Sequence, residues 1–375
     1  MILFLHNRYR TTGGEERAVE DLLWLVREHM GEPAELFALS SSTLGRRRAA
    51  LGLLRGGLEP GLVAQAVRSS GARVVHAHNL QPALGWRALA AARSSGARVV
   101  LHLHQYRLVC AIGVCFTRGA ECTRCHGRNT FAGVRLNCRQ SVPEAAAYAA
   151  SLSLWQRRLV EQADVVIVPS VFARERLREL GAPLAWEHVH VLPPPVRIEQ
   201  AGASSAAHGG GYALIVSRLS PEKGVDVAID ACRLAGIPLV VAGDGPDRDT
   251  LMQRAAGEDV SFLGQVDRAR LGELRGRAAV ALVPSRSGET FGLAAAEAMA
   301  AGLPVAASRV GSLPELLDED ALVTPGDPAA LAQAIERLAG DRVAGERGRE
   351  RVIARCSPDV VAAALGRLYD GEAAP

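Results

Sequence analysis

The sequence is poor in lysine and in aromatic residues. Of its 43 basic residues, 42 are arginine and one, Lys223, is lysine. Phe, Trp and Tyr make up 4% of the chain, which argues against a surface that stacks nucleic-acid bases. No apolar run is long enough to cross a bilayer, so we expect no membrane span.

Two further signals are missing near the start of the chain. Met1–Asn7 lack the basic residues, the long apolar centre and the small-residue cleavage site of an export signal, so we expect a cytoplasmic protein. No G-x-G-x-x-G motif follows the first predicted strand, which argues against a dehydrogenase.

The length and the strand pattern predict two α/β domains. The 375 residues exceed one ordinary core. Short runs of Val, Ile and Leu alternate with helical stretches, which is typical of doubly wound parallel sheets of the Rossmann-like type. We expect strands in the front half at 2–7, 35–40, 74–79, 99–104 and 164–170. In the back half we expect them at 213–219, 238–243, 260–264, 280–284, 304–308 and 321–324.

The boundary between the two domains follows a run of prolines. Pro193, Pro194 and Pro195 precede a stretch of Gly, Ala, Ser and His without apolar periodicity. The predicted organisation is an N-terminal domain over 1–195, a linker over 196–211 and a C-terminal domain over 212–357.

The charge is distributed unevenly between the halves. Residues 1–190 carry 24 Arg against 15 Asp and Glu, a net +9, whereas residues 191–375 carry 19 basic against 25 acidic residues, a net −6. A basic half suits an anionic partner such as nucleic acid, phospholipid or a phosphorylated acceptor. The segment 46–58, with three consecutive arginines and four leucines, fits either an interfacial amphipathic helix or a solvated charge run.

Cations and glycines follow the first strands of the back half. Arg218 leaves the predicted strand 213–219, and Lys223 follows in the loop before the next helix, so the two could clamp a diphosphate. A single lysine among arginines suggests a role for a compact, flexible ammonium. Gly243 and Gly245 lie in a turn where backbone can approach a ligand closely.

The segment 284–302 combines a strand end, a glycine-containing loop and an Ala-rich helix that begins near Gly292 and stops at Gly302. The start of such a helix attracts phosphate through its free N–H groups and positive dipole end. Glu289 precedes this helix and Glu297 lies inside it. Carboxylates beside phosphate suit sugar and ribose hydroxyls; the alternative is dipole compensation by Glu289 and a solvated Glu297.

These features together resemble glycosyltransferase family 4. The resemblance rests on the two glutamates with Gly292 between them, on Arg218 and Lys223, on the turn at 243–246 and on a glycine pair after the first strand, Gly13 and Gly14. It spans essentially the whole chain. It implies a GT-B fold, in which two Rossmann-like domains face each other across a cleft, and retaining transfer without a catalytic metal. It also implies that residues 358–375 form a helix that packs back on the N-terminal domain.

The resemblance also implies roles for individual residues. Arg218 and Lys223 would bind the donor diphosphate, and Glu289 and Glu297 would bind the sugar hydroxyls and the ribose. The remaining donor contacts would be Gly13, Gly14, Gly243, Gly245, Val266, Thr290, Phe291, Gly292 and Leu293. The donor is expected to be a UDP- or GDP-sugar, and the acceptor a glycan, a lipid-linked or a small molecule, with peripheral membrane contact through the basic half.

Two histidine pairs end the strands predicted at 74–79 and 99–104. Strand alternation places His76 with His78, and His102 with His104, on one face, which allows either a metal site or histidines satisfied by one another. The resemblance implies that His104 contacts the transferred sugar. The residue after it is usually Asp in the family and is Gln105 here, so we assign His104 to transition-state support rather than to proton transfer.

Five of the seven cysteines lie within 29 residues, in a segment over 105–141 that is too long for a bare loop. Cys122-x-x-Cys125 with Cys110 and Cys138 could form a structural zinc site, leaving Cys115 over. Free thiols or one disulfide are the alternative, and Cys232 and Cys356 are expected to pack in cores.

Three functions remain open from the sequence. The leading one is a retaining glycosyltransferase that resembles builders of bacterial surface polysaccharides. A nucleotide-sugar epimerase of the same fold would need no acceptor. A zinc-containing nucleic-acid binder would leave Lys223, Glu289 and Glu297 without a use, so we expect no nucleic-acid partner.

Overall fold

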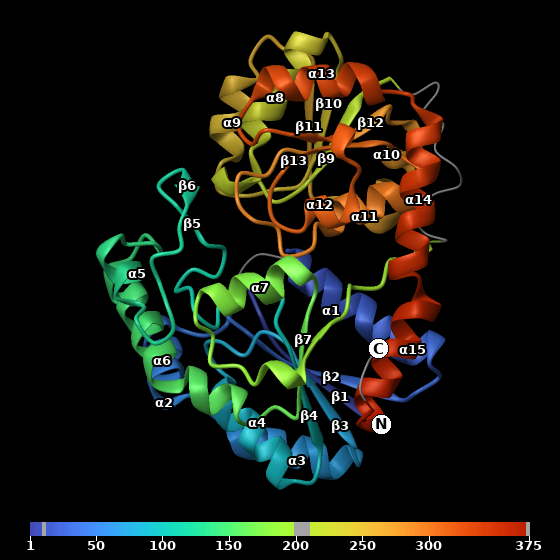
Figure 1. The fold of residues 1–375 in the computed structure, drawn as a ribbon. Coiled ribbons are helices and arrows are strands. Elements are labelled where there is room, and N and C mark those ends of the chain that lie inside the picture. Colours follow the sequence, from blue (N-terminus) through green and yellow to red (C-terminus); the bar gives the residue numbers. More distant parts are fainter. Residues whose placement is uncertain (10–12, 199–210, 373–375) are drawn as a thin grey trace. The chain divides into compact units, whose positions relative to one another are not determined.

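The chain folds into two compact units in the computed structural model, which describes residues 1–9, 13–198 and 211–372 (Figure 1). One unit comprises Met1–Thr117, Cys122–Pro195 and Pro358–Pro375; the other comprises Arg118–Glu121 and Val196–Ser357. We call them unit 1 and unit 2. Most of the predicted linker, residues 199–210, lies outside the described residues. So do the last three residues, 373–375, of the predicted segment 358–375.

Unit 1 is built on a six-stranded sheet whose strands all pair in parallel, in the order β2-β1-β3-β4-β7-β8. The strands are β1 Ile2–Arg8, β2 Ala34–Ser40, β3 Val74–Ala77, β4 Arg98–His102, β7 Val165–Val168 and β8 Val189–Val191. The first five confirm the predicted strands. β8 was missed, because a three-residue Val-His-Val run has too little apolar periodicity to be recognised.

Helices cover both faces of this sheet. On one face, α3 (Pro60–Ser70), α4 (Gly85–Ser94) and α7 (Val171–Glu179) pack on the strands. On the other face lie α1 (Gly14–Trp24), the π-helical turn Leu25–His29 and α15 (Pro358–Asp370). The helix α15 therefore returns to unit 1 after the chain has passed through unit 2.

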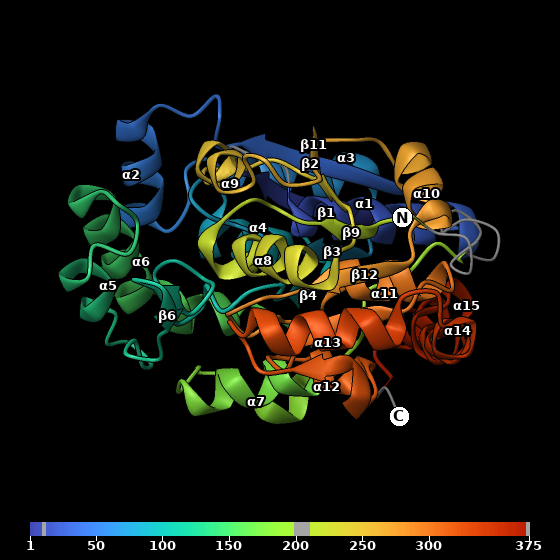
Figure 2. The same ribbon diagram turned by 90° about the horizontal axis from the view of Figure 1, so that it is seen from above.

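The rest of unit 1 is a peripheral layer. The helix α2 (Arg46–Arg55) packs against α6 (Val142–Val160), and the short α5 (Phe131–Arg135) also contacts α6 (Figure 2). The cysteine-rich segment, of which Arg118–Glu121 are assigned to unit 2, contains a small hairpin of β5 (Phe116–Thr117) and β6 (Ala120–Glu121).

Unit 2 has a second six-stranded parallel sheet, in the order β11-β10-β9-β12-β13-β14. Its strands confirm the predicted ones: β9 Ala213–Val216, β10 Leu239–Ala242, β11 Val260–Gly264, β12 Val280–Val283, β13 Val305–Ser308 and β14 Leu322–Val323. The order reverses between β9 and β12. Open α/β sheets bind ligands outside the carboxyl ends of the strands at such a switch point.

The helices of unit 2 lie on both faces of this sheet, and α8 packs against α13 while α11 packs against α14 (Figure 1). Their bounds are α8 Val225–Ala235, α9 Arg248–Arg254, α10 Arg268–Arg277, α11 Leu293–Ala300, α12 Leu313–Leu316, α13 Pro328–Leu338 and α14 Arg342–Cys356. In the described part of the chain, none of the helices combines the length and the apolar character that crossing a membrane requires.

Candidate functional site

The switch point of unit 2 brings the single lysine to a predicted carboxylate. Lys223 ends a 3-10 turn after β9, and Glu289 lies in the loop after β12. The Lys223 Nζ donates to Glu289 Oε1 over 2.6 Å, and the Ser285 hydroxyl donates to the same oxygen over 2.5 Å. Both side chains are partly exposed, at 27% and 16%. A cation and a carboxylate that accepts hydrogen bonds from hydroxyl groups thus lie side by side at the expected ligand-binding edge.

Glycines allow the backbone to close tightly around this pair. Gly224 has a φ of +64°, and a Cβ there would lie 2.1 Å from the Pro284 carbonyl oxygen. Gly311 has a φ of +61°, and a Cβ there would lie 2.3 Å from the backbone of Glu289. The loop is fixed further by Ser312, whose N–H and hydroxyl both donate to the Glu289 carbonyl, at 2.9 and 3.1 Å. The position of Glu289 is therefore set by its backbone.

Arg218 is held by an acidic neighbour. Its guanidinium pairs with Glu222, which also accepts a 2.7 Å hydrogen bond from the Ser220 hydroxyl. Burial raises the pKa of Glu222, but the charge of Arg218 and the Ser220 hydrogen bond outweigh it, so the pKa is lowered overall. Arg218 retains an exposed fraction of 42%, which leaves it reachable by an anion.

The predicted Ala-rich helix is α11, which confirms its expected start and end. Gly292, with a φ of +84°, precedes its first residue, Leu293. Glu297 is buried inside this helix and pairs with the buried Arg275 of α10. The solvated alternative for Glu297 is wrong, because the residue is only 8% exposed. Its ribose contact stays a prediction, as does backbone contact from Thr290 to Leu293.

The turn after β10 lies beside the end of β11. The Gly243 N–H donates to the Gly264 carbonyl over 2.8 Å, and a Cβ on Gly243 would lie 1.8 Å from the Ser217 carbonyl oxygen. Gly245 is equally crowded by Leu219. Val266 follows β11 at the carboxyl edge of the unit 2 sheet, beside the turn at Gly243. This is the edge at which the base of a donor would lie, and contact of Val266 with the base stays a prediction.

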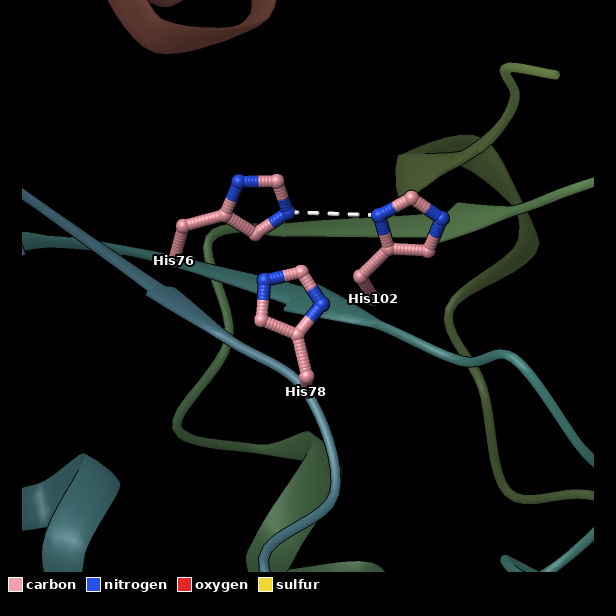
Figure 3. Close-up of side chains that lie close together, drawn as sticks. All are labelled: His76, His78 and His102. Carbon is pink, nitrogen blue, oxygen red and sulfur yellow. Dashed lines mark hydrogen bonds between the residues drawn. The ribbon is translucent and has the colours of Figure 1, made fainter. Parts of the chain in front are cut away.

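In unit 1, the strand histidines form a buried cluster. Figure 3 shows His76 and His78 from β3 and its carboxyl end beside His102 of β4. The His76 and His102 rings share a 3.3 Å Nε2···Nδ1 hydrogen bond, and His76 Nδ1 lies 2.7 Å from the Tyr369 hydroxyl of α15. His78 Nδ1 lies 2.9 Å from His104 Nε2. The predicted sharing of one sheet face is confirmed.

The histidine cluster fits mutual hydrogen bonding better than metal binding. Within the described residues, His76, His78 and His102 form the one group of three metal-ligating side chains whose ligand atoms lie within 4.8 Å of one another. However, the His76 and His102 nitrogens that face each other are already joined by a hydrogen bond. Burial, followed by the charge of His104, lowers the pKa of His76 to about 3, and burial also lowers the pKa of the other three histidines.

Two glutamates of α1 organise the carboxyl edge near these histidines. Glu15 accepts hydrogen bonds from the Tyr9 hydroxyl at 2.6 Å and from the Gln105 amide at 2.7 Å. Glu16 accepts from the backbone N–H groups of Tyr9 and Gly13, at 2.9 and 3.0 Å. Both glutamates follow the glycine pair directly in the sequence, but these contacts depend on how α1 packs and cannot be read from the sequence. Glu15 places a carboxylate beside Gln105. Position 105 is the one at which the family usually has Asp.

Gly13 and Gly14 lie at the start of α1, as expected. Gly13 is the residue before the helix, and its N–H is the donor to Glu16. Burial raises the pKa of Glu16, but the nearby His6 ring, 3.8 Å away, and the backbone hydrogen bonds from Tyr9 and Gly13 lower it by more, so the carboxylate is ionised. Contact of the glycine pair with a donor stays a prediction.

The four predicted zinc ligands lie near one another without closing around a metal position, and zinc binding stays a prediction. Burial, together with the nearby Cys110 and Cys122, raises the pKa of Cys138, and burial together with Cys110 and Cys138 raises that of Cys125. Cys110 is hydrogen-bonded to Cys115, which lowers the Cys110 pKa to about 6, more than burial raises it. Among the described residues, no three cysteine sulfurs lie within 4.8 Å of one another, so Cys110, Cys122, Cys125 and Cys138 do not form a tetrahedral set. All seven cysteines are free thiols, and Cys232 and Cys356 are buried, as expected.

The two halves of the chain match two known sequence families. Residues 7–195 match the family described as glycosyl transferase 4-like domain, and residues 210–341 match glycosyl transferases group 1.

Curated relatives match part of the chain. A Mycobacterium tuberculosis GDP-mannose-dependent alpha-(1-6)-phosphatidylinositol dimannoside mannosyltransferase is 34% identical over 188 residues, which are 47% of this chain and 49% of that protein. A glycogen synthase of the same organism is 32% identical over 229 residues, 56% of this chain and 55% of that protein. The chain thus spans about half the length of the curated relatives it matches.

Solved structures match nearly the whole chain. Sucrose-phosphate synthase from Thermosynechococcus elongatus superposes with a TM-score of 0.70 at 21% identity, over 98% of both chains. Anabaena HepE in complex with UDP superposes with a TM-score of 0.65 at 19% identity, over 98% of this chain and 99% of that one. These likenesses establish the fold.

Proposed function

We propose that this chain, which belongs to the glycosyltransferase family defined by the 4-like and group 1 domains, moves a sugar from a nucleotide-diphosphate-sugar donor to an acceptor with retention of configuration. The observation that carries the proposal is the Lys223–Glu289 pair at the switch point of unit 2. A diphosphate needs cations, and a sugar needs carboxylates that accept from its hydroxyls. The pair offers both, 2.6 Å apart.

The proposed chemistry uses this pair and Arg218. The bond between the anomeric carbon and the diphosphate oxygen breaks, and the acceptor oxygen attacks from the same face. The acceptor proton passes to the departing diphosphate. Arg218 and Lys223 stabilise the charge that develops on the leaving group, which is the kind of preorganised electrostatic support that contributes most to catalysis. Glu289 holds the sugar hydroxyls, Glu297 the ribose, and His104 the transferred sugar.

Binding of the donor changes the partner of Lys223. With Glu289 as its neighbour, the ammonium is preoriented at the strand edge, and a flexible four-carbon stem lets it turn to a phosphate oxygen. Glu289 is then released to accept from hydroxyls while Ser285 and its fixed backbone keep it in place. A planar guanidinium at position 223 would be larger and less free to make this exchange.

The donor and the acceptor are assigned by class. A UDP- or GDP-sugar is supported by a relative that uses GDP-mannose and by a neighbouring structure in complex with UDP. The acceptor is a glycan or a glycan carried by a lipid. Exposed Leu51 and Leu54 on α2, next to its arginines, support peripheral contact with an anionic membrane surface.

A thermal-shift panel followed by a transfer assay tests the proposal. UDP, GDP, ADP and TDP sugars are added to the full chain, and the sugar whose binding raises the unfolding temperature most is used as donor. We expect one nucleotide to stabilise the protein and Glu289→Ala to remove product formation. Stabilisation by none of the four, or isomerisation of the sugar without an acceptor, would contradict the transferase.

A further inference from the structure

The carboxyl edge of the unit 1 sheet carries a hydrogen-bonded network that the proposed chemistry does not use. Its members are Tyr9, Glu15, Gln105 and Arg107, and all four line a pocket of about 710 Å³ together with His104. Glu15 lies in the first turn of α1, whereas Gln105 and Arg107 follow β4. The network therefore joins two segments that are far apart in the sequence.

One oxygen of Glu15 holds this network together. Its Oε2 accepts a hydrogen bond of 2.6 Å from the Tyr9 hydroxyl and one of 2.7 Å from the Gln105 amide nitrogen. The same amide nitrogen donates to the Tyr9 hydroxyl oxygen over 3.0 Å, so the three side chains form a closed triangle. Burial raises the pKa of Tyr9 well above its ordinary value, although the charge of Arg107 lowers it in part, so the phenol keeps the proton that it donates.

The two side chains that donate to Glu15 are themselves fixed. The Arg107 guanidinium donates to Gln105 Oε1 over 3.3 Å, which determines the orientation of the amide. Gly113 has a φ of +92°, and a Cβ there would lie 2.7 Å from the same amide oxygen. The Arg107 guanidinium also lies 4.8 Å from the centroid of the Tyr9 ring. Glu15 thus meets a set of donors that is already in place.

The charge of Glu15 is not neutralised by a direct ion pair. Both groups that donate to its Oε2 are neutral, and its Oε1 accepts no hydrogen bond from the part of the chain that the structure describes. Arg107 is connected to it only through Gln105 and the Tyr9 ring. Because a partly enclosed pocket screens a charge less than bulk water does, Glu15 imposes a negative potential on the pocket.

This potential acts at His104. Burial lowers the pKa of His104, and the charge of Glu15 is the largest contribution that opposes this lowering. The net result is a neutral imidazole, which offers no charge of its own to the sugar that His104 is expected to contact. The negative charge available at this end of the pocket therefore comes from α1.

Positive charge arises at the transferred sugar only during the reaction. As the bond between the anomeric carbon and the diphosphate oxygen breaks, the sugar acquires the character of an oxocarbenium ion. A fixed negative charge nearby stabilises this transition state more than it stabilises the bound donor. Such an interaction raises kcat and leaves the affinity for the donor almost unchanged.

We propose that Glu15 is a positioning residue for transfer: held by Tyr9 and Gln105, it directs a negative potential to the end of the pocket that His104 lines. This inference rests on the proposed function, because the potential matters only where positive charge develops on a sugar. A neutral side chain of the same shape makes the same two hydrogen bonds, so the charge rather than the packing is what the experiment has to isolate.

Two substitutions separate the charge from the shape. Glu15→Gln keeps an oxygen that accepts from Tyr9 and Gln105 but removes the charge, whereas Glu15→Asp keeps the charge on a side chain one methylene shorter. The matched control is Glu20→Gln, the same change at an exposed position of α1. The full chain receives the nucleotide sugar that stabilises it most in the thermal-shift panel. Release of the nucleoside diphosphate is followed with water as the acceptor.

We expect Glu15→Gln to lower kcat for this release by about tenfold or more, with the donor KM and the unfolding temperature unchanged. Glu15→Asp should retain more of kcat than Glu15→Gln does, and Glu20→Gln should retain all of it. An unchanged kcat in Glu15→Gln, an equal loss in both variants of Glu15, or a loss that appears only as a higher donor KM would overturn the proposal.

The rate of the unmodified protein distinguishes this inference from the proposed function. Release of nucleoside diphosphate by the unmodified protein, with an equal kcat in Glu15→Gln, would overturn the role of Glu15 and leave the transferase standing. Absence of release from all four nucleotide sugars of the panel would contradict the transferase, and this inference with it.

Discussion

At the scale of single residues, the chemistry of unit 2 depends on one lysine. The Nζ of Lys223 contacts Glu289 Oε1. Every other basic residue of the chain is an arginine. Retention of an ammonium here fits an exchange of partners between a carboxylate and a phosphate. The planar guanidinium of arginine is suited to one fixed bidentate partner, as in the pair of Arg286 with Asp226.

Lys223→Arg is therefore expected to lower kcat/KM by about tenfold or more, despite conserving the charge, because one preorganised contact to the leaving group is misplaced.

Glu289→Ala should abolish transfer without altering the circular dichroism spectrum. Steady-state kinetics with the donor found by thermal shift checks both. Arg254→Lys, in an exposed pair on α9, is the matched control. A wild-type rate in Lys223→Arg would refute the role of the ammonium.

The buried pair of Arg275 and Glu297 makes a different prediction. Glu297→Ala leaves a guanidinium buried without its partner, which should lower the free energy of unfolding by about 3–5 kcal/mol. Replacing both residues, as Arg275→Met with Glu297→Met, should recover most of that stability. Urea denaturation measures both. If the double variant also binds nucleotide normally, Glu297 has no ribose role.

At the scale of elements, the carboxyl ends of β3 and β4 carry imidazoles that burial keeps neutral. The pKa of His76 is about 3 in the fold, against an ordinary 6.5. The unfolded chain therefore binds more protons between these two values, so stability is full above pH 6.5 and falls as the pH drops below it. This direction is shared by His78, His102 and His104, whose pKa values are also lowered.

Acidification from pH 7.5 to pH 5 is expected to cost unit 1 about 2 kcal/mol of stability from His76 alone. Urea unfolding across this range, followed through a unit 1 signal, measures it. His76→Phe should reduce the pH dependence by about this amount and leave the part contributed by the other three histidines. Stability that is constant down to pH 5 would show that the cluster is already protonated or solvated in the fold.

The cysteine-rich segment shows what the spacing of cysteines leaves open. Cys122-x-x-Cys125 suggested a chelating pair, yet the folded segment pairs Cys110 with Cys115, the residue left over in the zinc arrangement. The hairpin of β5 and β6 brings the Cys122 N–H to the Cys115 carbonyl over 2.7 Å, a contact that the spacing of the cysteines does not specify. Metal analysis of purified, reduced protein measures the remaining zinc prediction, and absence of stoichiometric zinc contradicts it.

At the scale of the whole molecule, the two sheets follow from the sequence more readily than the sites do. Runs such as Val165–Val168 and Val280–Val283 are apolar throughout because both faces of a parallel strand are buried, and that pattern is visible in one dimension. The meeting of Lys223 with Glu289 also follows from the motif. The contact between Trp86 of α4 and Trp155 of α6 does not, because it depends on how these two helices pack against each other.

The C-terminal helix gives a further prediction at this scale. Val361, Leu365, Leu368 and Tyr369 of α15 are buried in one core with Ile2 and Phe4 of β1. Ending the chain at residue 357 should expose that face and destabilise unit 1, with loss of the Tyr369 contact to His76. Differential scanning calorimetry should show the transition of unit 1 lowered or absent while that of unit 2 persists. Equal shifts of both transitions would contradict this assignment.

The return of α15 to unit 1 also affects the order in which the two units can complete their folding during synthesis. Unit 2 is complete when Ser357 leaves the ribosome, whereas unit 1 still waits for its last helix. Although domains usually mature from the N-terminus onward during synthesis, here the half that is translated second has all its residues first. During that interval the nascent chain presents an uncovered apolar sheet face, which is a binding site for chaperones and a point of vulnerability to proteases.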